Sequence, residues 1–267
     1  MIYIVCALQC EAKPIVEKYK LSLIPDKPFR IFQGKEMRVL VSGIGKIATA
    51  TAMAYLYALD GEQKNATWLN MGVAGHQSLE SGSLFNINKV TEDTTGVNWY
   101  PARFPSLAMS SHHVLTVETA SEDYPSDALY DMEASAFMLT ALRFSPVDLV
   151  QLLKIVSDNL ENPAMTINKV FVEKLIYRNI DQIMTVIDTL ETVSSEYANY
   201  YGIDELYNEL VTQWHFTQYQ KKQLQRLVQK TTALNLSLSC CNFEKMKNGK
   251  EIIRYLNETI TTAPVEY

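Results

Sequence analysis

A run of seven residues near the start of the chain, Ile2 to Leu8, is almost wholly apolar. A strand buried on both faces gives such a continuous run, whereas a strand with one wet face alternates between apolar and polar residues. The run therefore predicts a strand of a sheet covered by helices. Pro14 stands near the start of the amphipathic stretch that follows, in a position that a helix tolerates.

Two glycine turns add to the evidence for an α/β fold. Residues 42–46 (SGIGK) lead into the alanine-rich helical pattern of residues 47–59, and residues 72–76 (GVAGH) follow the strand-like residues 66–71. A strand, a glycine turn and a helix in this order form a ligand-binding βα junction. The first turn lacks the third glycine of a dinucleotide fingerprint, so by itself it does not identify a ligand.

The chain changes character after about residue 160. Before that point strand-like and helix-like segments alternate, and beyond it the apolar spacing is helical throughout. We expect a hairpin over 29–34 and 37–42, strands over 82–90, 112–119 and 147–157, a helix over 132–144, loops over 91–111 and 119–130, and helices over 168–191, 203–236 and 243–260. The sequence thus predicts an α/β domain over residues 1–190 and a helical extension over residues 191–267.

Composition argues against several classes of protein. Of the 267 residues 47% are hydrophobic and 20% charged, which is ordinary for a globular protein. The net charge of −6 and the lack of a basic stripe argue against nucleic-acid binding. No apolar run approaches the ~20 residues of a membrane-spanning helix, and the N-terminus lacks the positive start of a signal peptide. We expect a cytoplasmic protein that binds neither membrane nor nucleic acid.

Cysteine and histidine give no sign of a metal site or of disulfides. The four cysteines, Cys6, Cys10 and the adjacent residues 240–241, fit neither a disulfide framework nor a four-ligand zinc site. The four histidines have no metal-ligand spacing either, so we expect them to be structural.

Six short motifs, taken in their order along the chain, carry the functional prediction. They are CALQCEAKP (6–14), SGIGK (42–46), NMGVAGH (70–76), the Gly-Ser step at 82–83, YDMEASA (130–136) and KIVSDN (154–159). This order resembles the 5′-methylthioadenosine/S-adenosylhomocysteine nucleosidases within the purine nucleoside phosphorylase superfamily. The resemblance extends over about residues 1–190 and leaves the helical extension outside it.

The resemblance implies a fold and a role for individual residues. It implies a three-layer α/β/α core around a central mixed sheet, and a homodimer. Glu133 corresponds to the glutamate that binds the ribose, Asp158 to the acid that faces the purine, and Glu11 to the carboxylate that handles the hydrolytic water. The substrate-binding residues expected around these three acids are Met132, Gly72, Val73, Ala74, Gly75 and Ser157, with residues 42–45 supporting the same face.

The chemistry of a nucleosidase asks for such a set of acids. Cleavage of an N-glycosidic bond leaves positive charge on the ribose and negative charge on the departing base. Glu133 would stabilise the sugar cation, Asp158 would donate a proton to N7 of the base, and Glu11 would deprotonate the attacking water. Carboxylates that converge in one pocket push their pKa values apart, which supplies both an acid and a base. No metal or organic cofactor is implied.

Two other functions stay open. A phosphorylase must hold a phosphate dianion, normally with arginine; residues 68–71 contain none, Val73 stands where the family has serine, and Glu11 would repel phosphate. Hydrolysis is therefore favoured, although Arg30 and Arg38 remain candidate phosphate ligands. The second alternative is a nucleoside-binding sensor without catalysis, in which the helical extension contacts a partner.

The sequence departs from the family's pattern at the base-binding side. The stretch before residue 130 is shorter than in the family, and we consider Tyr124 or Phe104 as replacements for the aromatic residue that stacks on the base. His76 replaces a glycine, and Ser83 replaces an aspartate. These departures concern the identity of the substrate and leave the three acids in place.

Overall fold

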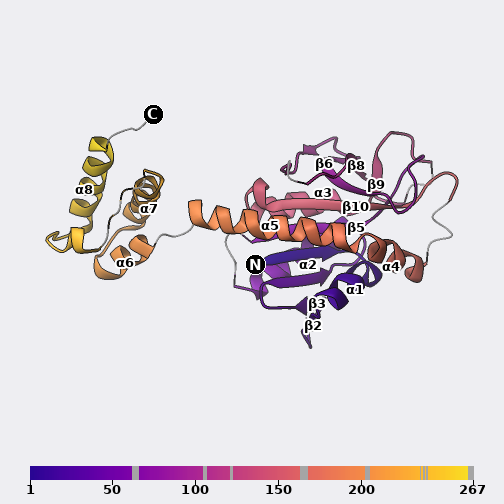
Figure 1. Ribbon diagram of the computed structural model, residues 1–267, viewed down its shortest axis with the longest axis horizontal. Coiled ribbons are helices and arrows are strands. Elements are labelled where there is room, and N and C mark those ends of the chain that lie inside the picture. The colour runs from indigo at the N-terminus through magenta and orange to yellow at the C-terminus, as the bar shows by residue number, and fades with distance from the viewer. Residues whose placement is uncertain are drawn as a thin grey trace. The chain divides into compact units, whose positions relative to one another are not determined.

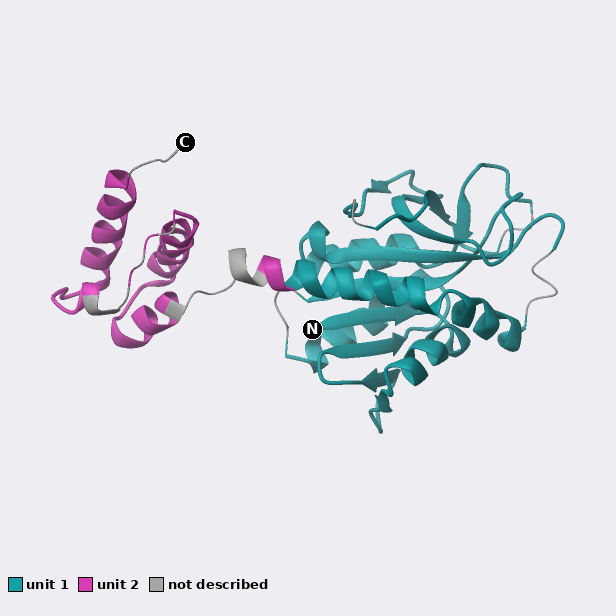
Figure 2. Ribbon diagram, viewed as in Figure 1, with its two compact units in different colours: residues 1–194 teal, residues 195–267 magenta. Residues whose placement is uncertain are grey.

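A computed structural model describes residues 1–61, 66–104, 107–120, 123–162, 168–201, 205–234, 236, 238 and 240–263. The chain forms two compact units, Met1–Ser194 and Ser195–Tyr267 (Figure 2). The cavity discussed below lies within the first unit.

A mixed sheet runs through the first unit, with ten strands among the described residues. At its centre β1 (Ile2–Cys6) pairs in parallel with β4 (Met37–Val41) and with β5 (Thr67–Gly75). β5 pairs in parallel with β10 (Val150–Asp158). All residues of β1 and β10 are buried, as expected of strands covered on both faces. The predicted first strand is confirmed.

The other strands complete the sheet on both sides of this centre. β6 (Leu84–Glu92) is antiparallel to β10 and parallel to β8 (Ser111–Thr116), which is parallel to β9 (Leu129–Asp131). β9 meets β5 where Tyr130 pairs with Gly75, so that five strands close into a ring. The remaining strands are β2 (Ser22–Leu23), β3 (Arg30–Gln33) and β7 (Asn98–Trp99).

Helices cover both faces of the sheet and give the three-layer α/β/α fold that was predicted (Figure 1). α2 (Lys46–Leu59) and α3 (Ala134–Phe144) contribute buried residues to one hydrophobic core. α1 (Gln9–Lys18), α4 (Lys169–Arg178) and α5 (Ile180–Tyr201) contribute to the core on the other side. A short 3-10 turn, Val147–Leu149, precedes β10.

Several predicted boundaries in the first unit were wrong. The loops predicted over 91–111 and 119–130 contain β7 and the start of β9. The glycine turn at 72–76 is mostly strand, because β5 continues to Gly75 alongside β10. The helix predicted over residues 168–191 is two helices that meet at Asn179. The buried Asn179 side chain donates to the carbonyls of Gly82 (3.0 Å) and Leu175 (2.9 Å), which fixes the break.

The second unit is helical, as predicted, with its own hydrophobic core. The long helix predicted over 203–236 is divided into α6 (Glu205–Gln213) and α7 (Gln218–Ala233). Thr217 starts α7 with a capping box, in which its hydroxyl accepts from the amide of Gln220. After the 3-10 turn Cys240–Phe243 comes α8 (Gly249–Thr262).

In the described part of the chain, no helix combines the length and the apolar character that crossing a bilayer requires.

Because each unit has its own core, a core change in one should leave the other intact. Leu210 is fully buried in the second unit. We expect Leu210→Ala to lower the free energy of unfolding of that unit by about 2–5 kcal/mol. Hydrogen exchange followed by mass spectrometry should then rise in α7 and α8 and stay unchanged in β1 and β5. Tyr219→Ala, at a side chain 77% exposed, is the matched control; a rise in β1 and β5 would contradict separate cores.

Candidate active site

A cavity of about 410 Å³ lies where the carboxyl ends of the parallel strands meet. Ligands of α/β proteins bind at this edge of the sheet. Eight of the predicted site residues line it: Glu11, Val73, Ala74, Gly75, Met132, Glu133, Ser157 and Asp158. They come from four segments far apart in the sequence.

Glu11 is held in place by backbone amides. It lies in the first turn of α1, directly after β1, and is only 3% exposed. Its Oε2 accepts a hydrogen bond from the amide of Leu8 (2.8 Å), and its Oε1 accepts one from the amide of Val73 (3.0 Å). Burial raises the pKa of Glu11, although these amides and the charge of Lys154 act against the rise. A carboxylate has about four lone-pair sites, so Glu11 can accept a proton from water in addition to these hydrogen bonds.

Gly72 makes room for this carboxylate. A Cβ at position 72 would lie 2.8 Å from Oε1 of Glu11, which is closer than real Cβ contacts come. Any side chain there would displace Glu11 or shift β5. Gly72 was predicted to bind the substrate. It does not belong to the described lining of the cavity and lies against Glu11 instead.

Glu133 begins α3 and reaches across to the first glycine turn. Its Oε1 accepts a hydrogen bond of 2.7 Å from the amide of Gly45, and the residue is 7% exposed. Of residues 42–45, predicted to support the binding face, Gly45 contacts Glu133 through this amide. Burial and the negative charge of Asp131 raise the pKa of Glu133 to about 7, while Lys154 and the Gly45 amide lower it.

A buried lysine balances the acids. Lys154, on β10 and 2% exposed, forms an ion pair of 2.8 Å with Asp131. Asp131 also accepts hydrogen bonds from the amide of Ala134 and the hydroxyl of Thr116, both at 2.8 Å. Burial lowers the pKa of Lys154, but the charges of Asp131, Glu133 and Glu11 more than reverse this, so its pKa is raised.

Neither Lys154 nor Asp131 was predicted as a site residue. A visible signal was the lysine inside the otherwise apolar run that became β10, since a charge in a buried strand needs a partner. Asp131 was part of the YDMEASA motif but had no role assigned to it.

Asp158 ends β10 and accepts two hydroxyl hydrogen bonds. Ser157 donates to Oδ1 and Tyr124 donates to Oδ2. Tyr124 is 4% exposed and lines the cavity. The other aromatic candidate, Phe104, packs instead against the core formed with α1, α4 and α5.

The two arginines considered as phosphate ligands lie elsewhere. Arg38 pairs with Asp60 (3.3 Å) and donates to the carbonyls of Gly34 and Met37. Arg30 is exposed on β3. Among the described residues that line the cavity, none is basic.

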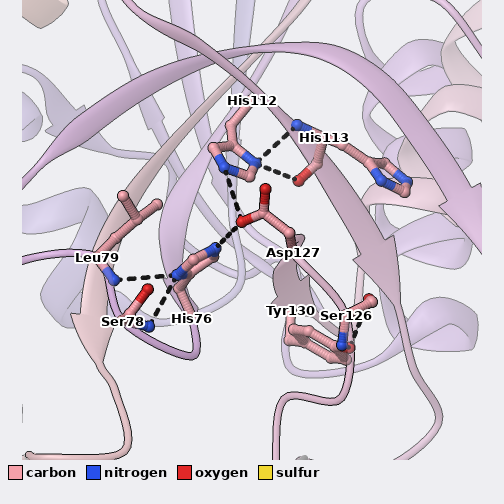
Figure 3. Close-up of polar contacts among 8 residues, drawn as sticks. All are labelled: His76, Ser78, Leu79, His112, His113, Ser126, Asp127 and Tyr130. Carbon is pink, nitrogen blue, oxygen red and sulfur yellow. Dashed lines mark hydrogen bonds and ion pairs between the residues drawn. The ribbon is translucent and has the colours of Figure 1, made fainter.

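The structure also brings two histidines, His76 and His112, together with Asp127 (Figure 3). Nitrogen atoms of His76 and His112 and an oxygen of Asp127 lie within 4.8 Å of one another, a set that could hold a metal ion. His76 Nδ1, however, accepts hydrogen bonds from the amides of Ser78 (3.1 Å) and Leu79 (3.0 Å). In the neutral ring the proton then lies on Nε2, which faces Asp127 as a donor at 3.0 Å.

A metal ion would need the opposite tautomer. A ligating histidine binds through a free lone pair and normally donates its other N–H to an acceptor. Here the other nitrogen of His76 accepts from two amides. The cluster therefore fits a hydrogen-bonded contact between Asp127 and His76 better than it fits a metal centre.

Comparison with known proteins relates this fold to nucleosidases. No family model matches the chain, and no curated protein matches it by sequence. Among solved structures, a 5′-methylthioadenosine/S-adenosylhomocysteine nucleosidase from Helicobacter pylori, with butyl-thio-DADMe-Immucillin-A, aligns at a TM-score of 0.57 and 18% identity. The match covers 70% of this chain and 97% of that one.

Two further structures agree with this match. Futalosine hydrolase of Helicobacter pylori strain 26695 aligns at a TM-score of 0.58 and 18% identity, over 70% of this chain and 97% of the other. The methylthioadenosine/adenosylhomocysteine nucleosidase of Colwellia psychrerythraea 34H, in complex with adenine, aligns at 0.52 and 18%, over 68% and 94%. The chain has the fold that its motifs predicted.

Lys154 should be essential for stability. Lys154→Met leaves Asp131 buried without its cation, and removing one partner of a buried pair costs about 3–5 kcal/mol. We expect chemical denaturation to show a loss of this size in the free energy of unfolding. Lys27→Met, at an exposed position, is the control and should be neutral. An equally small effect at both positions would mean that the pair does not stabilise the fold.

Glu133 should make stability depend on pH. Its pKa is about 7 in the folded protein and 4.5 ordinarily, so the folded state binds this proton more tightly. The contribution of Glu133 to the free energy of unfolding is fully present below pH about 4.5 and is lost as the pH rises through about 7. Glu133→Gln keeps an oxygen for Gly45 but carries no charge.

We therefore expect the melting temperature of Glu133→Gln to exceed that of the wild type at pH 8, with the difference shrinking towards pH 5. Glu36→Gln, at an exposed turn position, should show no such trend. A wild-type advantage that grows with pH would contradict the raised pKa.

Proposed function

We propose, from the fold shared with methylthioadenosine/adenosylhomocysteine nucleosidases, that this protein hydrolyses the N-glycosidic bond of a purine nucleoside. The observation that carries the proposal is the convergence of three buried carboxylates, Glu11, Glu133 and Asp158, on one cavity. Each comes from a different segment, and each is oriented by hydrogen bonds from its surroundings. The same fold in the Colwellia nucleosidase holds adenine.

Glu133 is the proposed ribose-binding group. As the C1′–N9 bond breaks, positive charge develops on the sugar, and a carboxylate next to it is stabilising in a buried site. The Gly45 amide occupies one position on Oε1 and leaves Oε2 for a ribose hydroxyl. Met132 precedes it in the lining and offers an apolar surface to the sugar.

Asp158 and Glu11 are the proposed proton donor and acceptor. The electron pair of the C1′–N9 bond passes to the base, and N7 takes a proton from Asp158. Water adds its oxygen to C1′ and gives a proton to Glu11, whose raised pKa favours accepting it. Proton transfers of this kind typically contribute about 10²–10⁴-fold to the rate.

Water is the proposed nucleophile. A phosphate dianion would face Glu11 and Glu133 with no basic side chain among the described residues that line the cavity. The nearby Lys154 is already paired with Asp131.

A 5′-thio-substituted adenosine, methylthioadenosine or adenosylhomocysteine, is the proposed substrate class. The lining includes the apolar side chains of Leu8, Ile44 and Val117, which suit an apolar 5′ substituent.

We further propose a homodimer, because Ile44 (57% exposed) and Ile47 (86% exposed) present an apolar surface beside the cavity. The cytoplasmic location stays a prediction of the sequence.

The test is release of free base from methylthioadenosine, adenosylhomocysteine, adenosine and inosine, with and without phosphate. We expect release that is independent of phosphate, about 10²-fold or more slower in Glu133→Gln and unchanged in Glu36→Gln. Release only with phosphate would make the protein a phosphorylase. Binding of a nucleoside without any release would favour the sensor function.

A further inference from the structure

Tyr124 contacts the acid that the proposed mechanism assigns to the base. Its hydroxyl donates to Oδ2 of Asp158, the group that is to face N7 of the purine. Ser157 donates to the other oxygen. Because Tyr124 lines the cavity together with Asp158, a base that approaches Oδ2 meets the tyrosine hydroxyl already bound there.

Close packing places this tyrosine against β5. A Cβ at Gly75 would lie 2.6 Å from Cζ of Tyr124, so only glycine admits the ring at this point. Tyr124 has a φ of +40°, which residues other than glycine rarely adopt. A residue kept in such a conformation is normally held there by its surroundings.

Ser126 and Asp127, two and three residues after Tyr124, hold its segment in place. The amide of Ser126 donates to the Tyr130 hydroxyl at 2.9 Å, and the Ser126 hydroxyl lies 2.7 Å from the same oxygen. Asp127 accepts from His76 Nε2 at 3.0 Å (Figure 3). His76 is 1% exposed and is itself fixed by two backbone amides, so it is a rigid anchor for the segment that carries Tyr124.

We propose that Tyr124 is a specificity-determining residue that competes with the substrate's base for Asp158, and that the Asp127–His76 contact holds it in this position. The inference rests on the proposed function. The cavity then favours ligands whose own hydrogen bond to Asp158 is more stable than that of the Tyr124 hydroxyl. A base without a polar group at this position cannot replace the bond that it breaks.

The experiment measures the dissociation constant of adenine, which the enzyme does not cleave, by calorimetry. Tyr124→Phe removes the competing hydroxyl and keeps the ring. Asp127→Ala releases the segment from outside the cavity, at a side chain 77% exposed. We expect both variants to bind adenine about threefold to tenfold more tightly than the wild type, because Tyr124→Phe has no hydrogen bond to Asp158 to break and Asp127→Ala no longer holds the Tyr124 hydroxyl in place. Asp123→Ala, an exposed acid of the same segment, should leave the constant unchanged.

A second readout needs no ligand. Hydrogen exchange over residues 123–130 should rise in Asp127→Ala and not in Asp123→Ala, if the contact with His76 holds the segment. Unchanged exchange would overturn the holding role of Asp127. Stoichiometric binding of Zn²⁺ that is lost in Asp127→Ala would also overturn it, and would make the cluster a metal site.

The outcomes separate the two proposals. Base release from the nucleosides, with adenine bound equally or more weakly by Tyr124→Phe and Asp127→Ala, would contradict the competition and leave the nucleosidase standing. If binding is weaker in both variants, the competition is contradicted and Tyr124 contributes to binding of the base. No release and no adenine binding by any form would contradict the proposed function and the competition with it.

Discussion

The buried ammonium group of Lys154 is the interaction on which the site depends. The carboxylates of Asp131, Glu133 and Glu11 would repel one another without a cation among them, and a buried charge without a partner costs several kcal/mol. Lys154, in the middle of a fully buried strand, supplies the positive charge and forms an ion pair with Asp131. The pair also joins β10 to β9, two strands that are not neighbours in the sheet order. One ion pair therefore both balances charge in the site and links β10 to β9 across the ring of strands.

The proposed acids are held by backbone amides more than by other side chains. Glu11 receives the amides of Leu8 and Val73, and Glu133 receives that of Gly45. Backbone donors of this kind are fixed by the secondary structure, so the carboxylates are oriented before any ligand arrives. The amides do not fully offset burial, because the pKa values of Glu11 and Glu133 are still raised. Such a site suits proton transfer near neutral pH.

Asp158 differs from the other two acids because its hydrogen-bond donors are hydroxyl groups. Ser157 is its neighbour in β10, but Tyr124 comes from a separate segment that is fixed through Asp127. A contact between side chains can be exchanged for a ligand, whereas the amide of a strand cannot move away without opening the sheet. The base side of the cavity is consequently the part that ligand identity can change. It is also where the sequence departs from the pattern of the nucleosidases.

The sequence alone determined the features that depend on local order. The apolar run from Ile2, the glycine turn before α2 and the acids at or soon after the ends of strands all follow from local order along the chain. Parallel strands then bring their carboxyl ends to one edge of the sheet. Only the tertiary structure decided which distant residues are partners: Lys154 with Asp131, and His76 with Asp127. It also showed β5 continuing to Gly75. Hydrophobic periodicity records which residues are buried, but not which buried polar groups face one another.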